Sequence, residues 1–391
     1  METIVPKISS SLSKMWTKVL NLEKSLFPAL KEELRLEALS QKEQKLISIL
    51  DFAQIEKNIT IASITNTPKD REEIARAFIA KSVYNIQTTR DLINRLHCDR
   101  TLRILCGWRY KNDIPSESKF SRVFQELSEI NIAQKTHEKF VKEYLSQKTF
   151  FYNATDATKI PLRQKPVKKD KMEKVKHKAG RPKKGETREP IKPKILQQQK
   201  ELLTVEEKLT LVSRECGVGI KQNSKGNREV WIGGKLHISA VDGDIPVTAF
   251  YSGANVHDSS VALPLIQETS KRVNYLYDLQ DAGYDADIIR EFSTYLGHRP
   301  IIDINPKNSK ELKAKIELME HESKIFKYIN QQLNCDEEHY NQRSMVERVN
   351  KYLKDDFGCD KIYYQGATKV ASVLAFGILS ICIHQSLKLL T

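Results

Sequence analysis

The chain has few cysteines, and none of them has the spacing of a metal site or of a disulfide framework. Its six cysteines are scattered over 391 residues without a Cys-x-x-Cys pair, so we expect reduced thiols and no structural zinc. No basic start followed by an apolar run opens the sequence, which argues against a signal peptide. The longest apolar run, residues 370–383, is too short to span a bilayer and predicts a buried helix. These absences favour a cytoplasmic protein.

Acidic residues are outnumbered. The sequence has 64 Lys and Arg against 50 Asp and Glu, for a formal net charge of +14 at pH 7. Sixteen of the basic residues, but only four acidic ones, lie between residues 159 and 200. This segment has five prolines and no Phe, Tyr or Trp, so it cannot bury a core and should be a disordered insertion at about 160–200. The positive excess points to a polyanionic partner, either nucleic acid or an anionic membrane surface.

One short motif inside the basic segment has the composition of a DNA minor-groove binder. It reads KAGRPKKGE over residues 178–186 and resembles an AT-hook, whose slim Gly-Arg-Pro core lies in a narrow minor groove. General attraction to phosphates, or a merely solubilising loop, are the alternatives. The DNA-binding candidates in this segment are Lys178, Arg181, Lys183 and Lys184.

The first 145 residues have the periodicity of helices. We predict a helical N-terminal segment over 1–66 and a second helical region over 67–145. The second region opens with a helix-start signal at Thr67 and Pro68, and Thr88 and Asp91 are placed like a capping box. Short helices among basic residues suit a helix-turn-helix DNA reader, but a plain helical scaffold fits equally well.

From residue 146 the pattern changes to strands. A strand in KTFFYNATDATKI precedes the basic insertion, and two strands joined at residues 242–244 follow it. Helices and strands then alternate. A three-stranded meander that feeds alternating units predicts a mixed β-sheet with helices on its faces, in the order of an RNase H-like fold. The fold class is therefore α+β, with a helical N-terminal region and a sheet domain over 146–391.

Three acidic residues lie on or directly after predicted elements of the sheet domain. Asp156 lies in the first strand, Asp281 follows the fourth, and Glu347 lies in the helix of residues 340–358. If the first and fourth strands are neighbours, these carboxylates converge, and converging carboxylates require cations between them. Hard oxygen ligands suit Mg²⁺, and two such ions can hold the attacking and leaving oxygens of one phosphorus. Asp278 is an alternative to Asp281 if the strand ends earlier.

The segment YNQRSMVERVNKYLKDDFG, residues 340–358, predicts one amphipathic helix. At about 100° per residue, four polar side chains share an arc of about 60° opposite an apolar face. They are Tyr340, Arg343, Glu347 and Lys354. An ordinary solvated helix face is the alternative interpretation of the helix alone.

Taken together, these blocks resemble the DDE transposases of bacterial insertion sequences. The last helix fits the signature Y-x2-R-x3-E-x6-K at all four positions, and DAGYD around Asp281 fits a D-x-G-Y turn. The resemblance covers roughly residues 70–391. It implies that Asp156, Asp281 and Glu347 bind Mg²⁺, with Mn²⁺ as a substitute. It also implies that Tyr340, Arg343 and Lys354 hold DNA near the cleaved end.

The resemblance further implies cleavage at terminal inverted repeats and joining of the 3′ ends to target DNA. The implied partner is double-stranded DNA, bound by a homodimer at paired ends in the bacterial nucleoid, without a membrane. A non-catalytic domesticated DNA-binding protein and a Mg²⁺-dependent nuclease are the rival classes. Some relatives carry a Trp in a long insertion before the Glu, whereas the tryptophans here are Trp16, Trp108 and Trp231. His257 and Asp258 either assist the site or bond a strand end.

Overall fold

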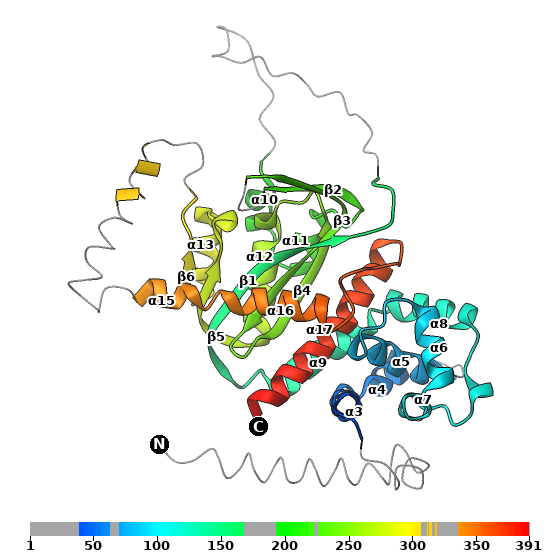
Figure 1. Cartoon of the computed structure of the whole chain (residues 1–391). Helices are drawn as coiled ribbons and strands as arrows, with labels where there is room; N and C mark the ends of the chain where they lie inside the picture. Colours follow the sequence, from blue (N-terminus) through cyan, green and yellow to red (C-terminus); the bar gives the residue numbers. More distant parts are fainter. Residues whose placement is uncertain are drawn as a thin grey trace, which may run out of the picture.

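The structure is a computed structural model (Figure 1). It describes residues 39–62, 70–167, 193–222, 226–305 and 335–390, with a few positions between 311 and 318. Several sequence predictions fall outside these ranges. They concern the helices before residue 39, the helix-start signal at Thr67 and Pro68, and the basic candidates Lys178, Arg181, Lys183 and Lys184.

The helical region precedes the sheet, as predicted. Its helices are α3 (Gln41–Ala53), α4 (Ile55–Ala62), α5 (Arg71–Val83), α6 (Thr89–Cys98), α7 (Arg100–Cys106), α8 (Glu117–Glu129) and α9 (Ile132–Tyr144). The Thr88 side chain accepts a hydrogen bond from the Asp91 backbone nitrogen at 3.1 Å, which confirms this predicted cap of α6. Helix α5 begins at Arg71, and Asp70 before it has a left-handed backbone (φ 71°).

A mixed sheet forms the second part of the chain. Its strands are β1 (Thr149–Pro161), β2 (Gly217–Gln222), β3 (Arg228–Val241), β4 (Ile245–Gly253), β5 (Asn274–Gln280) and β6 (Arg299–Ile302). The strand order is β2-β3-β1-β5-β6, and β4 pairs with β3. Strand β1 is antiparallel to β3 and parallel to β5. The first strand and the strand before Asp281 are therefore neighbours, which meets the condition for their acids to converge. Strand β2 was not predicted.

Turns and glycines fix the pairing of β3 with its neighbours. The predicted hairpin joins β3 to β4 through Gly243 (φ 82°) and Asp244 (φ 60°). Gly233 in β3 has φ 152°, and a Cβ atom there would lie 2.1 Å from the Ile160 carbonyl oxygen of β1. The backbones of β1 and β3 can approach each other in this way only because residue 233 has no side chain.

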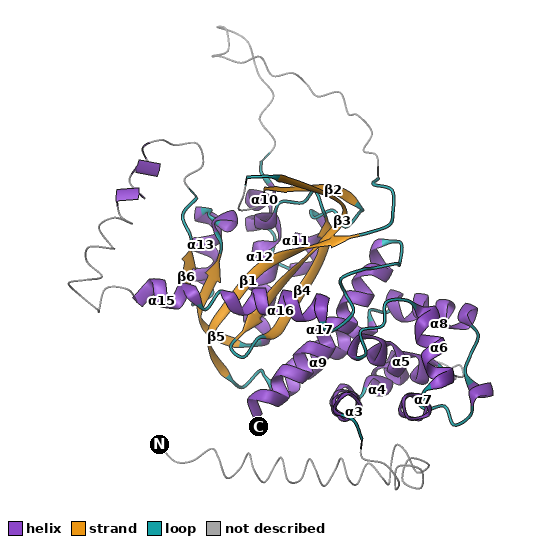
Figure 2. Cartoon of the chain, in the orientation of Figure 1, coloured by secondary structure: helices purple, strands orange, loops and turns teal. Residues whose placement is uncertain are grey.

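Helices cover both faces of the sheet (Figure 2). Helix α16 (Ser344–Asp355) packs across β1 and β3, and α12 (Ala262–Arg272) contacts β3, β4 and β5. The remaining helices of this part are α10 (Ile195–Glu201), α11 (Val205–Thr210), α13 (Asp287–Tyr295), α15 (Cys335–Asn341) and α17 (Ala367–Leu390). Sheet and helices together confirm the predicted α+β, RNase H-like class.

Helix α17 joins the sheet to the helical region. It contacts β4 on one side and α3, α5, α8 and α9 on the other (Figure 1). The Phe376 ring lies 5.7 Å from the ring of Phe78 in α5, which in turn stacks on Phe124 of α8 at 4.3 Å. One apolar core therefore runs through both parts of the chain.

The same helix contains the long apolar run. The helix over residues 367–389 is long and apolar enough to cross a membrane by length and composition, but 78% of its 18-residue apolar window is buried inside the fold. The predicted buried helix is confirmed. The helix is much longer than the run of residues 370–383, so its length alone does not exclude a membrane span. Its burial against the rest of the fold identifies it as a core helix.

Candidate active site

Asp156 and Asp281 are brought together by two paired parallel strands. The register of β1 and β5 places Thr155 opposite Gln280. Asp156 is the next residue on β1, and Asp281 follows directly after the end of β5. The Asp281 side chain bends back and accepts a hydrogen bond from the Gly283 backbone nitrogen at 2.9 Å, which opens the short helix η4 (Ala282–Tyr284). Strand pairing therefore brings these two carboxylates to one end of the sheet.

Both carboxyl groups are harder to ionise than in water. Burial raises the pKa of Asp156 to about 6, and the negative charge of Asp281 adds to this rise. Burial also raises the pKa of Asp281, with Asp258 adding to the rise. The Arg343 guanidinium opposes both shifts. Two carboxylates that lie close together and are partly buried repel each other when both are ionised. A cation that lies near both of them stabilises their ionised forms.

The predicted single helix over residues 340–358 is wrong. Tyr340 lies in α15 and Glu347 in the first turn of α16, while Arg343 occupies the turn between the two helices. Residues 341–343 include neither glycine nor proline, so the break has no signal in composition. Tyr340 and Arg343 nevertheless stay together, because the guanidinium lies 5.6 Å from the centre of the phenol ring.

Glu347 is held by an arginine. Arg343 Nη2 donates to Glu347 Oε1 at 2.7 Å, and the Glu347 side chain is 54% exposed. Burial lowers the pKa of Arg343, whereas the charges of Glu347, Asp156 and Asp281 raise it, and the net shift is upward. A single guanidinium thus lies among the three predicted acids and offsets part of their charge.

Lys354 lies beside the strand that carries Asp156. Its Nζ donates to Thr158 Oγ1 at 2.6 Å, two residues along β1 from Asp156 and therefore on the same face of the sheet. Burial lowers the Lys354 pKa, and the nearby charge of Lys159 adds to this effect. Lys221 of β2 lies close enough to lower the pKa of Asp156 and of Asp281. Sequence analysis did not single out Lys221, because β2 was not predicted.

Asp278, the alternative to Asp281, has a different environment. It is completely buried. Its carboxylate accepts hydrogen bonds from Asn153 Nδ2 at 3.0 Å and from Ser293 Oγ at 2.9 Å, with Gln280 Nε2 at 3.4 Å. Burial raises the pKa of Asp278. The donors around it belong to the interior of the sheet and helix α13.

Asp258 borders the acids, whereas His257 is engaged in its own turn. Lys235 Nζ donates to Asp258 Oδ1 at 2.8 Å, and the charge of Asp258 contributes to the raised pKa of Asp281. His257 Nδ1 and Ser259 Oγ share a hydrogen bond of 2.7 Å. Asp258 is thus bonded to a lysine inside β3, and His257 to a serine two residues further along the chain.

Two buried polar atoms beside the acids have no hydrogen-bond partner within the part of the chain that the structure describes. They are the Asn350 Oδ1 atom and the Tyr284 hydroxyl, on side chains that are 9% and 1% exposed. Sequence analysis missed Asn350, whose Nδ2 donates to Asp156 Oδ2 at 3.0 Å, since a contact 194 residues away leaves no local pattern. Buried polar atoms normally find a partner, so these two leave a place for a bound group.

A divalent cation fits this donor set. Carboxylate and amide oxygens are the hard ligands that Mg²⁺ and Mn²⁺ prefer. Within the described residues, however, no three acidic, His or Cys side chains are close enough together to form a finished metal cluster. Glu347 is paired with Arg343 instead, so a cation shared by all three acids requires this pair to open.

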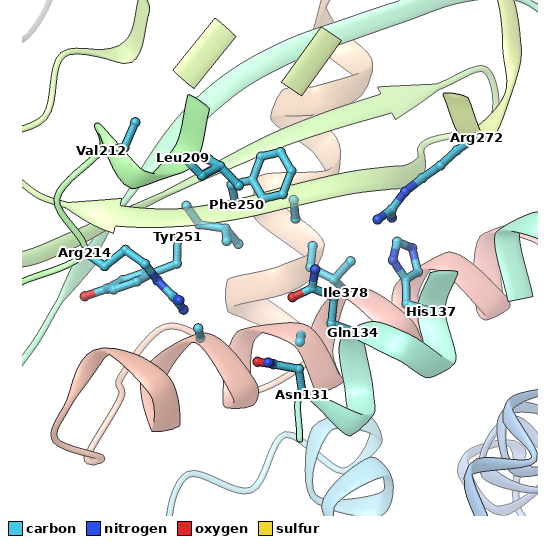
Figure 3. Close-up of a pocket in the computed structure, with 14 residues that line it drawn as sticks. Asn131, Gln134, His137, Leu209, Val212, Arg214, Phe250, Tyr251, Arg272 and Ile378 are labelled. Atoms are coloured by element: carbon cyan, nitrogen blue, oxygen red, sulfur yellow. The ribbon is translucent and has the colours of Figure 1, made fainter. Parts of the chain in front are cut away.

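The cavity shown in Figure 3 lies elsewhere, between α9, α17 and β4. It has a volume of about 200 Å³, and Arg272 and His137 line it. The Arg272 guanidinium is already paired with Glu138 at 2.7 Å and Glu268 at 2.9 Å. Burial lowers the pKa of His137 to about 3, so neither side chain offers an unpaired positive charge to a ligand.

Family comparisons identify the chain. Residues 33–126 match the family described as Transposase domain (DUF772), and residues 153–383 match the family described as Transposase DDE domain. The second match covers more than half of the chain, which therefore belongs to the DDE transposase family. It is a transposase of the insertion-sequence type, a family that acts on DNA and generally uses a divalent metal. No significant match is found among curated proteins or solved structures.

Proposed function

We propose that this transposase binds the terminal inverted repeats of its element, cleaves the DNA at both ends and joins the 3′ ends to target DNA. The observation that carries the proposal is the pairing of β1 with β5, which sets Asp156 beside Asp281. Helix α16 crosses the same strand and carries Glu347. Carboxylates from two strands and a helix are suited to divalent-cation phosphoryl transfer.

The three acids have distinct parts in this proposal. Asp156 and Asp281 are held by the sheet and by the Gly283 backbone nitrogen, so they form the fixed side of the site. Glu347 is half exposed on α16 and forms the adjustable side. When bound, Mg²⁺ or Mn²⁺ would neutralise charge on the reacting phosphate and on the departing oxygen.

Arg343 is placed to exchange partners. A guanidinium binds phosphate as well as carboxylate through a planar pair of donors. In the DNA-free chain Arg343 is bonded to Glu347. A DNA phosphate that takes this guanidinium frees Glu347 for the cation, so binding of an element end and completion of the site become one event.

Lys354 and Tyr340 extend the DNA contact on either side of Glu347. Lys354 contacts β1 at Thr158. Because burial removes part of the water around its ammonium group, a DNA phosphate nearby would stabilise its charged form. Tyr340 stacks with Arg343 from α15. The basic candidates Lys178, Arg181, Lys183 and Lys184 would add contacts that depend mainly on charge. Both ends must be held together for transposition, so we propose a homodimer on DNA in the cytoplasm.

Asp281 is preferred to Asp278 as the second acid. Asp278 is sealed among donors in the interior. Asp281 lies past the strand end, and its charge acts on Asp156 and Arg343. A cation can reach Asp281 without opening the core.

Single-turnover cleavage of linear DNA that carries the element's own ends tests this proposal. We expect cleavage to require Mg²⁺ or Mn²⁺ and to vanish in Asp156→Asn, Asp281→Asn and Glu347→Gln, while end binding persists. Asp355→Asn, an exposed acid at the end of the same helix, is the matched control and should cleave normally. Metal-independent cleavage, or full cleavage by any of the three variants, would contradict the assigned role. End binding without any cleavage by the wild type would favour a non-catalytic DNA-binding protein.

A further inference from the structure

The Asn350 side chain is hydrogen-bonded to the Asp156 carboxylate. It lies one helical turn after Glu347 on α16, on the side that packs against β1. Its neighbours Val349 and Leu353 are completely buried, so the helix holds the Asn350 backbone firmly. The side chain is 9% exposed and therefore has little freedom to turn toward solvent.

The direction of the Asn350 amide follows from chemistry. An ionised carboxylate only accepts hydrogen bonds. The amide nitrogen Nδ2 must therefore be the atom that faces Asp156 Oδ2, at 3.0 Å. This bond fixes one oxygen of Asp156, and the Ala157 backbone N–H is a second donor to the same carboxylate. Because the nitrogen of the Asn350 amide faces Asp156, the oxygen Oδ1 of the same amide points away from Asp156.

The Asn350 Oδ1 atom is buried and has no hydrogen-bond partner among the described residues. A buried acceptor without a partner costs free energy. The same amide is bonded to an acid whose own position is crowded by Asp281 and by burial. A divalent cation, or a water molecule that accompanies it, would satisfy this oxygen and relieve the crowded charge together.

We propose that Asn350 is a positioning residue for Asp156 and that its Oδ1 atom supplies a neutral oxygen to the divalent-cation site. This inference rests on the proposed function of the three acids. Asn350 selects which oxygen of Asp156 faces the cation, and it does so without adding negative charge to the site. Helix α16 therefore contributes two groups to one site, Glu347 and Asn350, one turn apart.

Asp156 and Asp281, the fixed side of the site, do not need DNA to release Glu347 from Arg343. Mn²⁺ binding to this fixed side in the DNA-free, full-length chain therefore tests the role of Asn350 without relying on cleavage. Free Mn²⁺ is counted by electron paramagnetic resonance in wild type, Asn350→Leu, Asn350→Gln and Asp156→Asn. Lys351→Ala, an exposed neighbour on the same helix, is the control. Residues that orient a metal ligand typically change metal affinity by about 10–100-fold. We expect Asn350→Leu to weaken Mn²⁺ binding at least tenfold, Asn350→Gln to recover part of the loss, and Lys351→Ala to match wild type.

The thermal midpoint of each variant in EDTA shows whether it is folded. If Asn350→Leu does not fold, Asn350→Ser removes the same amide with a smaller polar side chain. A folded Asn350 variant that binds Mn²⁺ within twofold of wild type, while Asp156→Asn has lost binding, would overturn this inference alone. If Asp156→Asn also binds normally, the cation is not held by these acids and the proposed function fails with it.

Discussion

Two aspartates three residues apart, Asp278 and Asp281, should respond in opposite ways to truncation. Asp278→Ala removes the acceptor of two close buried donors, Asn153 Nδ2 and Ser293 Oγ. An unsatisfied buried donor costs about 1–3 kcal/mol, which gives about 2–6 kcal/mol for the pair. Burial also raises the Asp278 pKa, so the cost of burying this carboxylate already cancels part of the stability that its two hydrogen bonds provide. We therefore expect a loss at the lower end, about 2–3 kcal/mol.

Asp281→Ala should barely change the free energy of unfolding. Asp281 has one short hydrogen bond, from the Gly283 backbone nitrogen, and its raised pKa shows that its charge is disfavoured in the folded state. An acid with a raised pKa contributes no net charge stabilisation at neutral pH, so its removal costs little. Cleavage should nevertheless vanish in Asp281→Ala and persist per folded molecule in Asp278→Ala.

Urea denaturation at pH 7.5 measures both changes, with the unfolding slope as a check on two-state behaviour. Single-turnover cleavage is then normalised to the folded fraction. The reasoning is refuted if Asp278→Ala is as stable as wild type, or if folded Asp278→Ala does not cleave while Asp281→Ala does. The second result would move the metal site into the interior of the sheet.

Four further outcomes are expected. Burial holds the pKa of His137 at about 3 and of His237 at about 4, so the unfolded chain takes up protons first as the pH falls below about 6.5; urea titrations should show about 1.4 kcal/mol lost per histidine per pH unit below that value. Lys354→Ala should weaken fluorescence-measured binding of pre-cut ends at least tenfold, through a lost contact of about 1.5–3 kcal/mol, with Lys351→Ala unchanged. Deletion of residues 165–194 should flatten the salt dependence of DNA binding; an unchanged slope would show that the segment does not touch DNA. Gly233→Ala should lower the unfolding free energy by about 1–3 kcal/mol by calorimetry, because φ is 152° and the Ile160 carbonyl blocks a Cβ.

Local patterns predicted much of the sheet domain. The β-branched and aromatic residues around Asp156 predicted β1, and the Asp-Gly-Asp turn predicted the β3–β4 hairpin. The order of strands and helices indicated the fold class, but the pairing of β1 with β5 stayed a condition that only the structure meets. Strand β2 was missed because GVGIKQ has two glycines in six residues, and its alternating Val218 and Ile220 are too short an apolar pattern to indicate a strand.

The candidate site was only partly visible in the sequence. Its three acids stand out because they lie on or directly after predicted elements and fit a family resemblance. The break between α15 and α16 cannot be predicted from the sequence. Arg343 comes three residues after Tyr340 and stays near its side chain with or without the break. The bonds of Asn350 to Asp156 and of Lys354 to Thr158 join positions far apart in the chain. Such contacts depend on how α16 packs on β1, which no local pattern specifies.

The central claim is that Asp156, Asp281 and Glu347 hold one divalent-cation site. Fe²⁺ bound in place of Mg²⁺, with ascorbate and peroxide, cuts the polypeptide backbone next to its ligands, and mass spectrometry locates the cuts. The account predicts cuts near residues 156, 281 and 347 that Mg²⁺ in excess suppresses and that Asp156→Asn removes together. Cuts confined to other positions, or cuts at these three that persist unchanged in Asp156→Asn, would contradict it.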